Sequence, residues 1–200
     1  MLCDFVSSLR RALALARLPI LAVALTYLIS VLAGALMVHA ANEFAFSFRD
    51  ELVAKAQTGS VLTRAEPLMM ALTDFRDNLF GASIDTIGGF GIVFPLPLVA
   101  YRGWVGGIVS VDGSHASRIL DPKSSAYYLS VVLLQLTGYT LAGGAGVNVG
   151  LSLWRVPPHY AGPKWLGMSV EALRDLLRIY SLVIPILLVA SLWEFLSPWN

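Results

Sequence analysis

The stretch NLFGASIDTIGGFGIVFPLPLVAYRGWVGGIVS, residues 78–110, decides the fold class of this 200-residue chain. It carries seven glycines, two prolines and a single acidic residue, Asp85, and it is long enough to cross the roughly 30 Å of hydrocarbon in a bilayer. Pro95 and Pro97 have no backbone N–H to donate, so we expect the helix to bend or break there. Lipid cannot satisfy the freed backbone groups, so protein or water must cover the break.

The composition of the whole chain is that of a membrane protein. Hydrophobic residues make up 56% of the chain and charged residues 14%, whereas soluble domains carry about 25% charge. The net charge of +1 gives no indication of a nucleic-acid partner. The single cysteine, Cys3, excludes an intramolecular disulfide and any paired-cysteine motif. We therefore predict one all-α domain over residues 1–200, a polytopic membrane helix bundle inserted in the lipid bilayer of the cell membrane.

Four apolar segments predict about four transmembrane helices. The first follows three arginines, and its apolar run exceeds the ~7–15 residues of a signal peptide, which favours a retained helix over a cleaved signal. Within it, Ser30 and Gly34 form a small-xxx-small pair that lets another helix pack closely. The predicted spans are residues 18–41, 78–101, 125–154 and 173–196.

The segment between the first two spans, residues 42–77, differs in character. It holds six acidic and four basic residues, with apolar residues recurring among them at helical spacing. We predict two short amphipathic helices, broken near residues 58–60 and at Pro67. These helices can lie on the membrane surface or pack on the protein as an extramembrane cap. The polar face is not enriched in lysine and arginine, which favours the cap.

The orientation of the chain depends on the count of spans. Four spans place both termini on the same side of the membrane. Basic residues are then equal in number on the two sides, but the arginine cluster before the first span favours termini in the cytoplasm.

A few polar residues in or near the spans are candidates for a site. A carboxylate in hydrocarbon is costly unless it is paired, so Asp85 and Glu194 mark either an ion or proton site or an interhelical contact. We favour the interhelical contact, which for Asp85 includes pairing with Arg102. Gly146 and Gly150 are four residues apart and make a flat face for helix packing. The candidate residues are Asn78, Asp85, Arg102, Gln135, Asn148, Glu194, Gly146 and Gly150.

The sequence contains no recognisable catalytic constellation. Nucleotide-binding loops, nucleophile elbows and cysteine–histidine arrangements are absent. The three histidines, His39, His115 and His159, lie at a span end and in loops, without metal-ligand spacing. We therefore expect a protein that is not an enzyme and that carries no cofactor.

Three pieces of the chain resemble the stage II sporulation protein M family of integral membrane proteins. Asn78 opens a glycine-punctuated segment that closes in Gly103-x-x-x-Gly107, as the family's second helix does. The run LAGGAG at residues 141–146 resembles the small-residue run that follows the family's His-Gly-x-x-Glu-Leu-Pro motif. The end of the chain, ASLWEFLSP at residues 190–198, resembles the family's closing Ala-x-x-x-Glu-x-x-x-Pro. Together the pieces cover roughly residues 15–198 in the family's order.

The chain departs from the family at its most polar motif. The His and Glu of that motif fall on Val131 and Gln135 here, so chemistry that needs this protonatable pair is in doubt. In spore formers the resemblance implies a partner of cell-wall hydrolases. Together with the small-residue faces, it favours a scaffold or accessory subunit that binds other membrane subunits or its own copies. The proline-broken second span and the intramembrane acids favour the alternative, a small transporter or permease-like protein.

Overall fold

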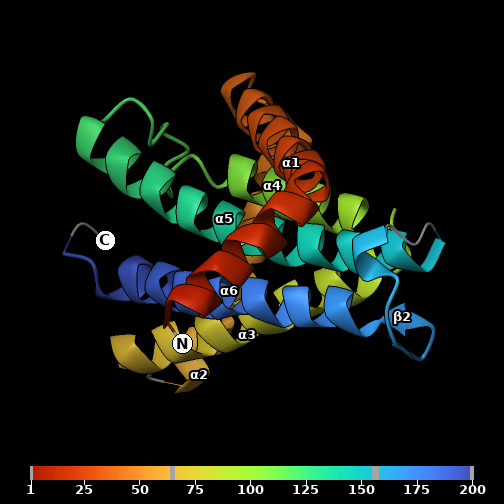
Figure 1. Cartoon of the computed structure of the whole chain (residues 1–200). Coiled ribbons are helices and arrows are strands. Elements are labelled where there is room, and N and C mark those ends of the chain that lie inside the picture. Colours follow the sequence, from red (N-terminus) through yellow and green to blue (C-terminus); the bar gives the residue numbers. More distant parts are fainter. Residues whose placement is uncertain (1, 64–65, 155–157, 199–200) are drawn as a thin grey trace.

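The computed structural model describes residues 2–63, 66–154 and 158–198, and these form the all-helical bundle that the sequence predicts (Figure 1). A connector between the last two long helices holds a short 3-10 helix and two antiparallel strands. The elements in chain order are α1 (Leu2–His39), α2 (Glu43–Thr63), α3 (Pro67–Gly89), α4 (Pro95–Ile108), α5 (Pro122–Trp154), η1 (Pro158–Tyr160), β1 (Lys164–Trp165), β2 (Met168–Ser169) and α6 (Val170–Leu196).

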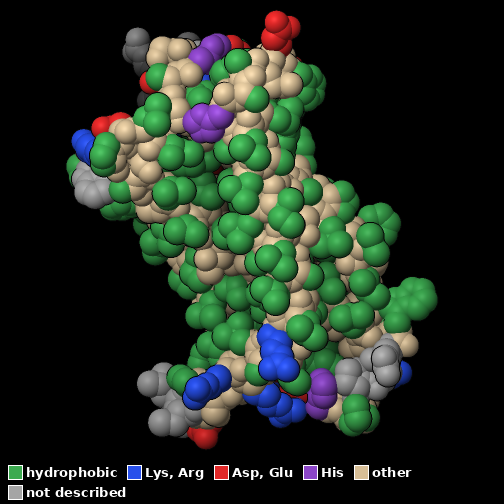
Figure 2. All heavy atoms as spheres, turned by 90° about the horizontal axis from the view of Figure 1, so that it is seen from above, with side chains coloured by type: hydrophobic (Ala, Val, Ile, Leu, Met, Phe, Trp, Pro, Cys, Tyr) green, Lys and Arg blue, Asp and Glu red, His purple; other side chains and the backbone are tan. Residues whose placement is uncertain are grey.

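Three of these helices are long and apolar enough to cross a membrane. The candidate spans are Asp4–His39, Pro122–Trp154 and Val170–Leu196. The last two contain the predicted spans 125–154 and 173–196, and the first covers the predicted span 18–41 up to His39. Figure 2 shows most charged side chains gathered towards two opposite ends of the molecule, with a broad band rich in hydrophobic side chains between them. This distribution is the one that a bilayer requires of an inserted protein.

The predicted span 78–101 is not a single helix. Helix α3 ends at Gly89 and α4 begins at Pro95, and Ile92 between them has a positive φ of 65°. The prolines are the reason, because Pro95 occupies the first turn of α4, where its missing N–H costs nothing. The predicted break is therefore confirmed.

Contacts with α5 show that α3 runs parallel to it. The Thr86 hydroxyl donates a hydrogen bond of 3.0 Å to the Ala142 carbonyl, and one turn further on Gly89 packs on Gly146. Helix α4 runs in the opposite direction, since Pro95 at its start lies near Gly143 of α5, which is late in that helix. Helices α3 and α4 therefore form a hairpin that enters the bundle and returns.

Helices α1 and α6 both run antiparallel to α5, which places the two termini at opposite ends of the bundle. Leu15 of α1 packs in a cluster with Tyr160 of the connector. At the other end, Tyr127 near the start of α5 donates a hydrogen bond of 2.6 Å to the Glu194 carbonyl near the end of α6. We call these ends the connector end and the α2 end. The expectation that both termini share one side of the membrane rested on four spans, and it stays a prediction.

The glycine faces predicted from the sequence are packing surfaces within the chain. The Ser30–Gly34 pair of α1 meets Gly103 and Gly107 of α4, where an added Cβ would overlap the backbone of the other helix. Small residues let two backbones approach this closely in a membrane.

The segment 42–77 forms α2 and the first turns of α3. The predicted break at Pro67 is confirmed, since α3 begins there, but α2 continues through residues 58–60 without the predicted interruption. The start of α2 packs on the protein, with Ala45 fully buried in a cluster that includes Val38 and Ile108. This part of the segment is therefore the cap that the charge pattern favours.

Candidate functional site: a polar path into the bundle

The hairpin brings Asp85 of α3 opposite Arg102 of α4. The Asp85 side chain is completely buried, and one of its oxygens lies 3.6 Å from Nε of Arg102. Neither carboxylate oxygen has a hydrogen-bond partner. The pairing of Asp85 with Arg102 that the sequence favours is confirmed. The buried carboxylate lacks the hydrogen bonds that usually offset the cost of burying a charge.

Arg102 is held on its other faces by Gly81 and Tyr139. Its guanidinium lies 4.5 Å from the centre of the Tyr139 ring of α5, a cation–π arrangement. A side chain at position 81 would overlap the guanidinium, so Gly81 makes room for it. Arg102 keeps 27% of its side chain exposed, so it faces open space as well as Asp85.

A chain of hydrogen bonds continues from Tyr139 across three helices. The Tyr139 hydroxyl donates to the side-chain carbonyl of Asn78. Asn78 donates through Nδ2 to Asp74 at 2.7 Å, and the Ser191 hydroxyl of α6 donates to the same Asp74 oxygen at 2.6 Å. Asp74 is thus a carboxylate with two donors, in contrast to Asp85.

A second carboxylate, Glu194, lies nearer the α2 end. Gln135 of α5 donates through Nε2 to Glu194 at 2.9 Å, which joins α5 to α6. This contact is the interhelical hydrogen bond that the sequence favours for Glu194. Gln135, Glu194 and Val131 border the same pocket.

Three adjoining pockets lead from the α2 end to Arg102. The outer pocket, about 600 Å³, opens among residues 112–127 and includes Arg118 and Tyr127. The middle pocket, about 210 Å³, shares Arg118 and Tyr127 with it and borders Glu194. The inner pocket, about 250 Å³, shares Gln135 with the middle one and reaches Arg102. The shared residues place the three pockets next to one another between the α2 end and Arg102, and we call this series of pockets the path.

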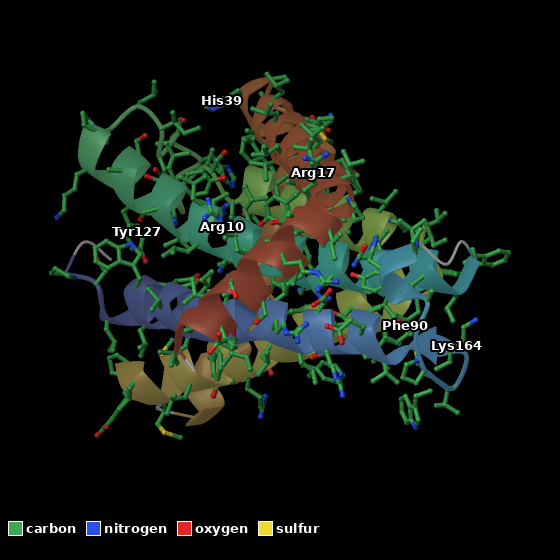
Figure 3. All side chains as sticks on the ribbon, viewed as in Figure 1. Arg10, Arg17, His39, Phe90, Tyr127 and Lys164 are labelled. Carbon is green, nitrogen blue, oxygen red and sulfur yellow. The ribbon has the colours of Figure 1, made fainter. Side chains whose placement is uncertain are left out.

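Five of the eight candidate residues line these pockets or contact a residue that does, and three lie elsewhere. The five are Asn78, Asp85, Arg102, Gln135 and Glu194. Gly146 and Gly150 pack against α3, where an added Cβ would overlap the backbone at Thr86 and Gly89. Figure 3 shows Tyr127 at one end of the bundle and Phe90 and Lys164 at the other.

Asn148 belongs to a separate cluster at the connector end. It donates through Nδ2 to the Tyr160 hydroxyl at 2.8 Å, and that hydroxyl donates to Asp175 at 3.1 Å. Burial raises the pKa of Tyr160 to about 12, so the phenol stays protonated and keeps donating to the carboxylate. This cluster ties the connector to α5 and α6 and has no contact with the pockets.

Reasoning from the sequence missed Asp74, Tyr139 and Arg118. Asp74 lies four residues before Asn78 and Tyr139 four residues after Gln135, so each shares a helix face with a candidate residue. That spacing was the available signal. Arg118 lies in a loop of the sequence, and only the fold brings it to the mouth of the path.

The fold and the site define a class: an α-helical polytopic membrane protein with a broken helical hairpin and a buried ion pair reached from one end. The model of the stage II sporulation protein M family matches residues 23–198, and the chain belongs to that family. Searches of curated proteins and of solved structures gave no match.

Proposed function

We propose that this protein is a small permease-like transporter in which a small polar or charged solute reaches Arg102 from the α2 end. The observation that carries the proposal is the succession of three pockets that share lining residues and end at the Asp85–Arg102 pair. Ionisable residues inside a membrane bundle typically mark a pathway for an ion or a substrate.

The broken hairpin supports the same function. Discontinuous helices form the substrate sites of many transporters, and the helices around such a site move relative to one another. Here α4 packs chiefly on α1, whereas α3 packs on α5 and α6. The Asp85–Arg102 pair therefore joins the two helices of the hairpin, which the turn at residues 90–94 links in sequence.

Glycine faces give no support to the other role considered from the sequence, a scaffold or accessory subunit. The faces at Gly34, Gly107, Gly146 and Gly150 are occupied by helices of this chain. A scaffold role stays a second proposal because α2 and residues 109–121 form an ordered layer outside the bundle. Phe44 and Leu120 are exposed there by 61% and 84%, and a partner would bind this layer.

The test is flux in proteoliposomes, with a panel of labelled small anions, cations and zwitterions. We expect uptake of one class, lost in Asp85→Ala and reduced in Glu194→Ala. Asp77→Ala is the matched control, because Asp77 is on α3 as well but is 62% exposed on its surface. Absence of flux for every solute, together with a stoichiometric partner after gentle-detergent purification, would instead establish the scaffold.

A further inference from the structure

The chemistry of the inner pocket selects one kind of ligand. Arg102 is the only charged residue among those that line it, and Tyr27, Tyr101, Val105 and Tyr139 supply most of its walls. A guanidinium presents a planar fork of N–H donors that matches a carboxylate. The pocket therefore suits a small monocarboxylate, with the carboxylate on Arg102 and an apolar body against the aromatic rings.

Asp85 competes with such a ligand for Arg102. It is completely buried and accepts no hydrogen bond, so Arg102 at 3.6 Å is its sole compensation for the lost hydration. A ligand carboxylate that takes over Arg102 leaves Asp85 as an uncompensated charge in a low-dielectric interior. The least costly response of a buried carboxylate in that position is to take up a proton.

The titratable groups near Asp85 on neighbouring helices are an arginine and phenols, whereas the carboxylates Asp74 and Glu194 have hydrogen-bond donors. Asp85 is faced by Arg102 of α4 and interacts with Tyr139 of α5. The hydroxyl of Tyr180 of α6 contacts Thr86, the next residue in the chain, and the Ala82 carbonyl. Tyr27 of α1 lies beside Arg102. Asp74 accepts hydrogen bonds from Ser191 and from Asn78. Glu194 accepts one from Gln135.

We infer that Arg102 binds the carboxylate of a small monocarboxylate and that Asp85 is protonated as the ligand arrives, so that one anion and one proton enter the site together. The site is neutral before and after: an arginine cation with an aspartate anion becomes an arginine cation with a ligand anion and a neutral aspartic acid. The proton comes from hydronium or a buffer acid in the solvent: an O–H bond of that donor breaks, the new O–H bond on Asp85 forms, and the donor's conjugate base stays in the solvent. The inference rests on the proposed transport function and names its substrate class and coupling.

Calorimetry on the protein in lipid nanodiscs tests the inference. Pyruvate and benzoate are the probes, with choline as a cationic control, and titrations in buffers of different ionisation enthalpy give the protons taken up per ligand. We expect uptake of close to one proton with pyruvate or benzoate and no binding of choline. Arg102→Gln should weaken binding by about tenfold or more, the effect of losing a charged hydrogen-bond partner.

Asp85→Asn is the decisive variant, because an amide cannot take up the proton and does not compete as an anion. It should bind the monocarboxylate at least as tightly as the wild type, with no proton uptake and no dependence on pH. Infrared difference spectra should show the C=O band of a protonated carboxylic acid on ligand addition in the wild type and not in Asp85→Asn. Arg102→Lys, which keeps the charge, controls for misfolding and should retain part of the binding.

The outcomes separate this inference from the proposed function. Binding without proton uptake, or binding unaffected by Arg102→Gln, overturns the inference. Flux of a cation or zwitterion without any binding of pyruvate or benzoate also overturns it and leaves the transporter standing. Absence of flux for all solutes overturns the proposed function itself.

Discussion

Gly34 of α1 and Gly107 of α4 lie so close that neither position has room for a Cβ. The contact is made between the backbones of the two helices, because a Cβ on Gly107 would overlap the Val31 carbonyl. We call this α1–α4 contact the seam. Dispersion forces between the closely packed backbones stabilise it, because the hydrophobic effect does not drive helix association in lipid.

Widening the seam should destabilise the bundle. Gly107→Leu forces α4 away from α1, and we expect a loss of about 1–3 kcal/mol, the usual cost of overpacking. Thermal unfolding in detergent, followed by fluorescence-detected size exclusion, measures the effect. Gly106→Ala is the control, because the nearest atom to a Cβ there is the Tyr27 hydroxyl at 3.8 Å. Equal stability of the two variants would contradict the described seam.

The stability that the connector cluster of Asn148, Tyr160 and Asp175 provides should depend on the Tyr160 hydroxyl. Tyr160→Phe removes the hydroxyl that joins Asn148 to Asp175 and leaves both buried polar groups with one partner fewer. We expect a loss of about 1–3 kcal/mol of stability in the same assay. His159→Phe, at the exposed neighbouring position, should have little effect.

The pH dependence of that cluster follows from the Tyr160 phenol. Burial raises its pKa to about 12, above the ordinary value of about 10 for a tyrosine, so the folded state holds the proton more tightly than the unfolded chain. The stabilisation is complete below pH 10 and is lost as the pH rises through about 12. The stability difference between the wild type and Tyr160→Phe should therefore be constant between pH 6 and 9, and a slope in that window would contradict the assignment.

An acid introduced at position 135 should make the stability of the protein fall as the pH rises. Gln135→Glu replaces the amide that donates to Glu194 at 2.9 Å with a second carboxylate. Two ionised carboxylates at this distance repel each other, so one must hold a proton for the contact to persist. Unfolding temperatures measured from pH 5 to 9 should drop more steeply for this variant than for the wild type. Gln135→Leu, which also loses the hydrogen bond but adds no charge, is the matched control.

The attachment of the cap, the start of α2, to the rest of the protein should depend on Arg49. This arginine is 4% exposed and donates through Nη2 to the Val111 carbonyl at 3.3 Å, which ties α2 to the loop before α5. Arg49→Ala should increase hydrogen exchange in residues 109–121 without lowering the protection of α5. Lys55→Ala, at an exposed site on the same helix, should leave the exchange unchanged.

Hydropathy predicted the three long helices because each is a long run of apolar residues. It could not distinguish a bend from a reversal at residues 90–94, since prolines at the start of a helix and prolines that kink one look alike in sequence. The return of α4 depends on Ile92, which adopts a positive φ that its β-branched side chain disfavours and that no sequence pattern announces.

The charged residues of the candidate site could be predicted from the sequence, because a buried charge needs a partner. Its aromatic residue Tyr139 could not. Asp85 and Arg102 stand out as charges in an apolar stretch, and their pairing follows from the cost of burial. Tyr139 did not stand out, because tyrosines in membrane helices commonly serve as packing or interface residues. Its role under the Arg102 guanidinium appears only when α4 and α5 are placed together.

The pairing of α1 with α4 also has a consequence for biosynthesis. The ribosome delivers α1 to the bilayer first, yet the helix that fills its glycine face is made only after α2 and α3. Until α4 is made, the glycine face of α1 is exposed to lipid. A helix of another protein can then bind this face, or a quality-control protease can degrade the chain. A nascent chain that stalls before Gly107 should therefore be degraded, whereas one released after α4 has a partner already in place.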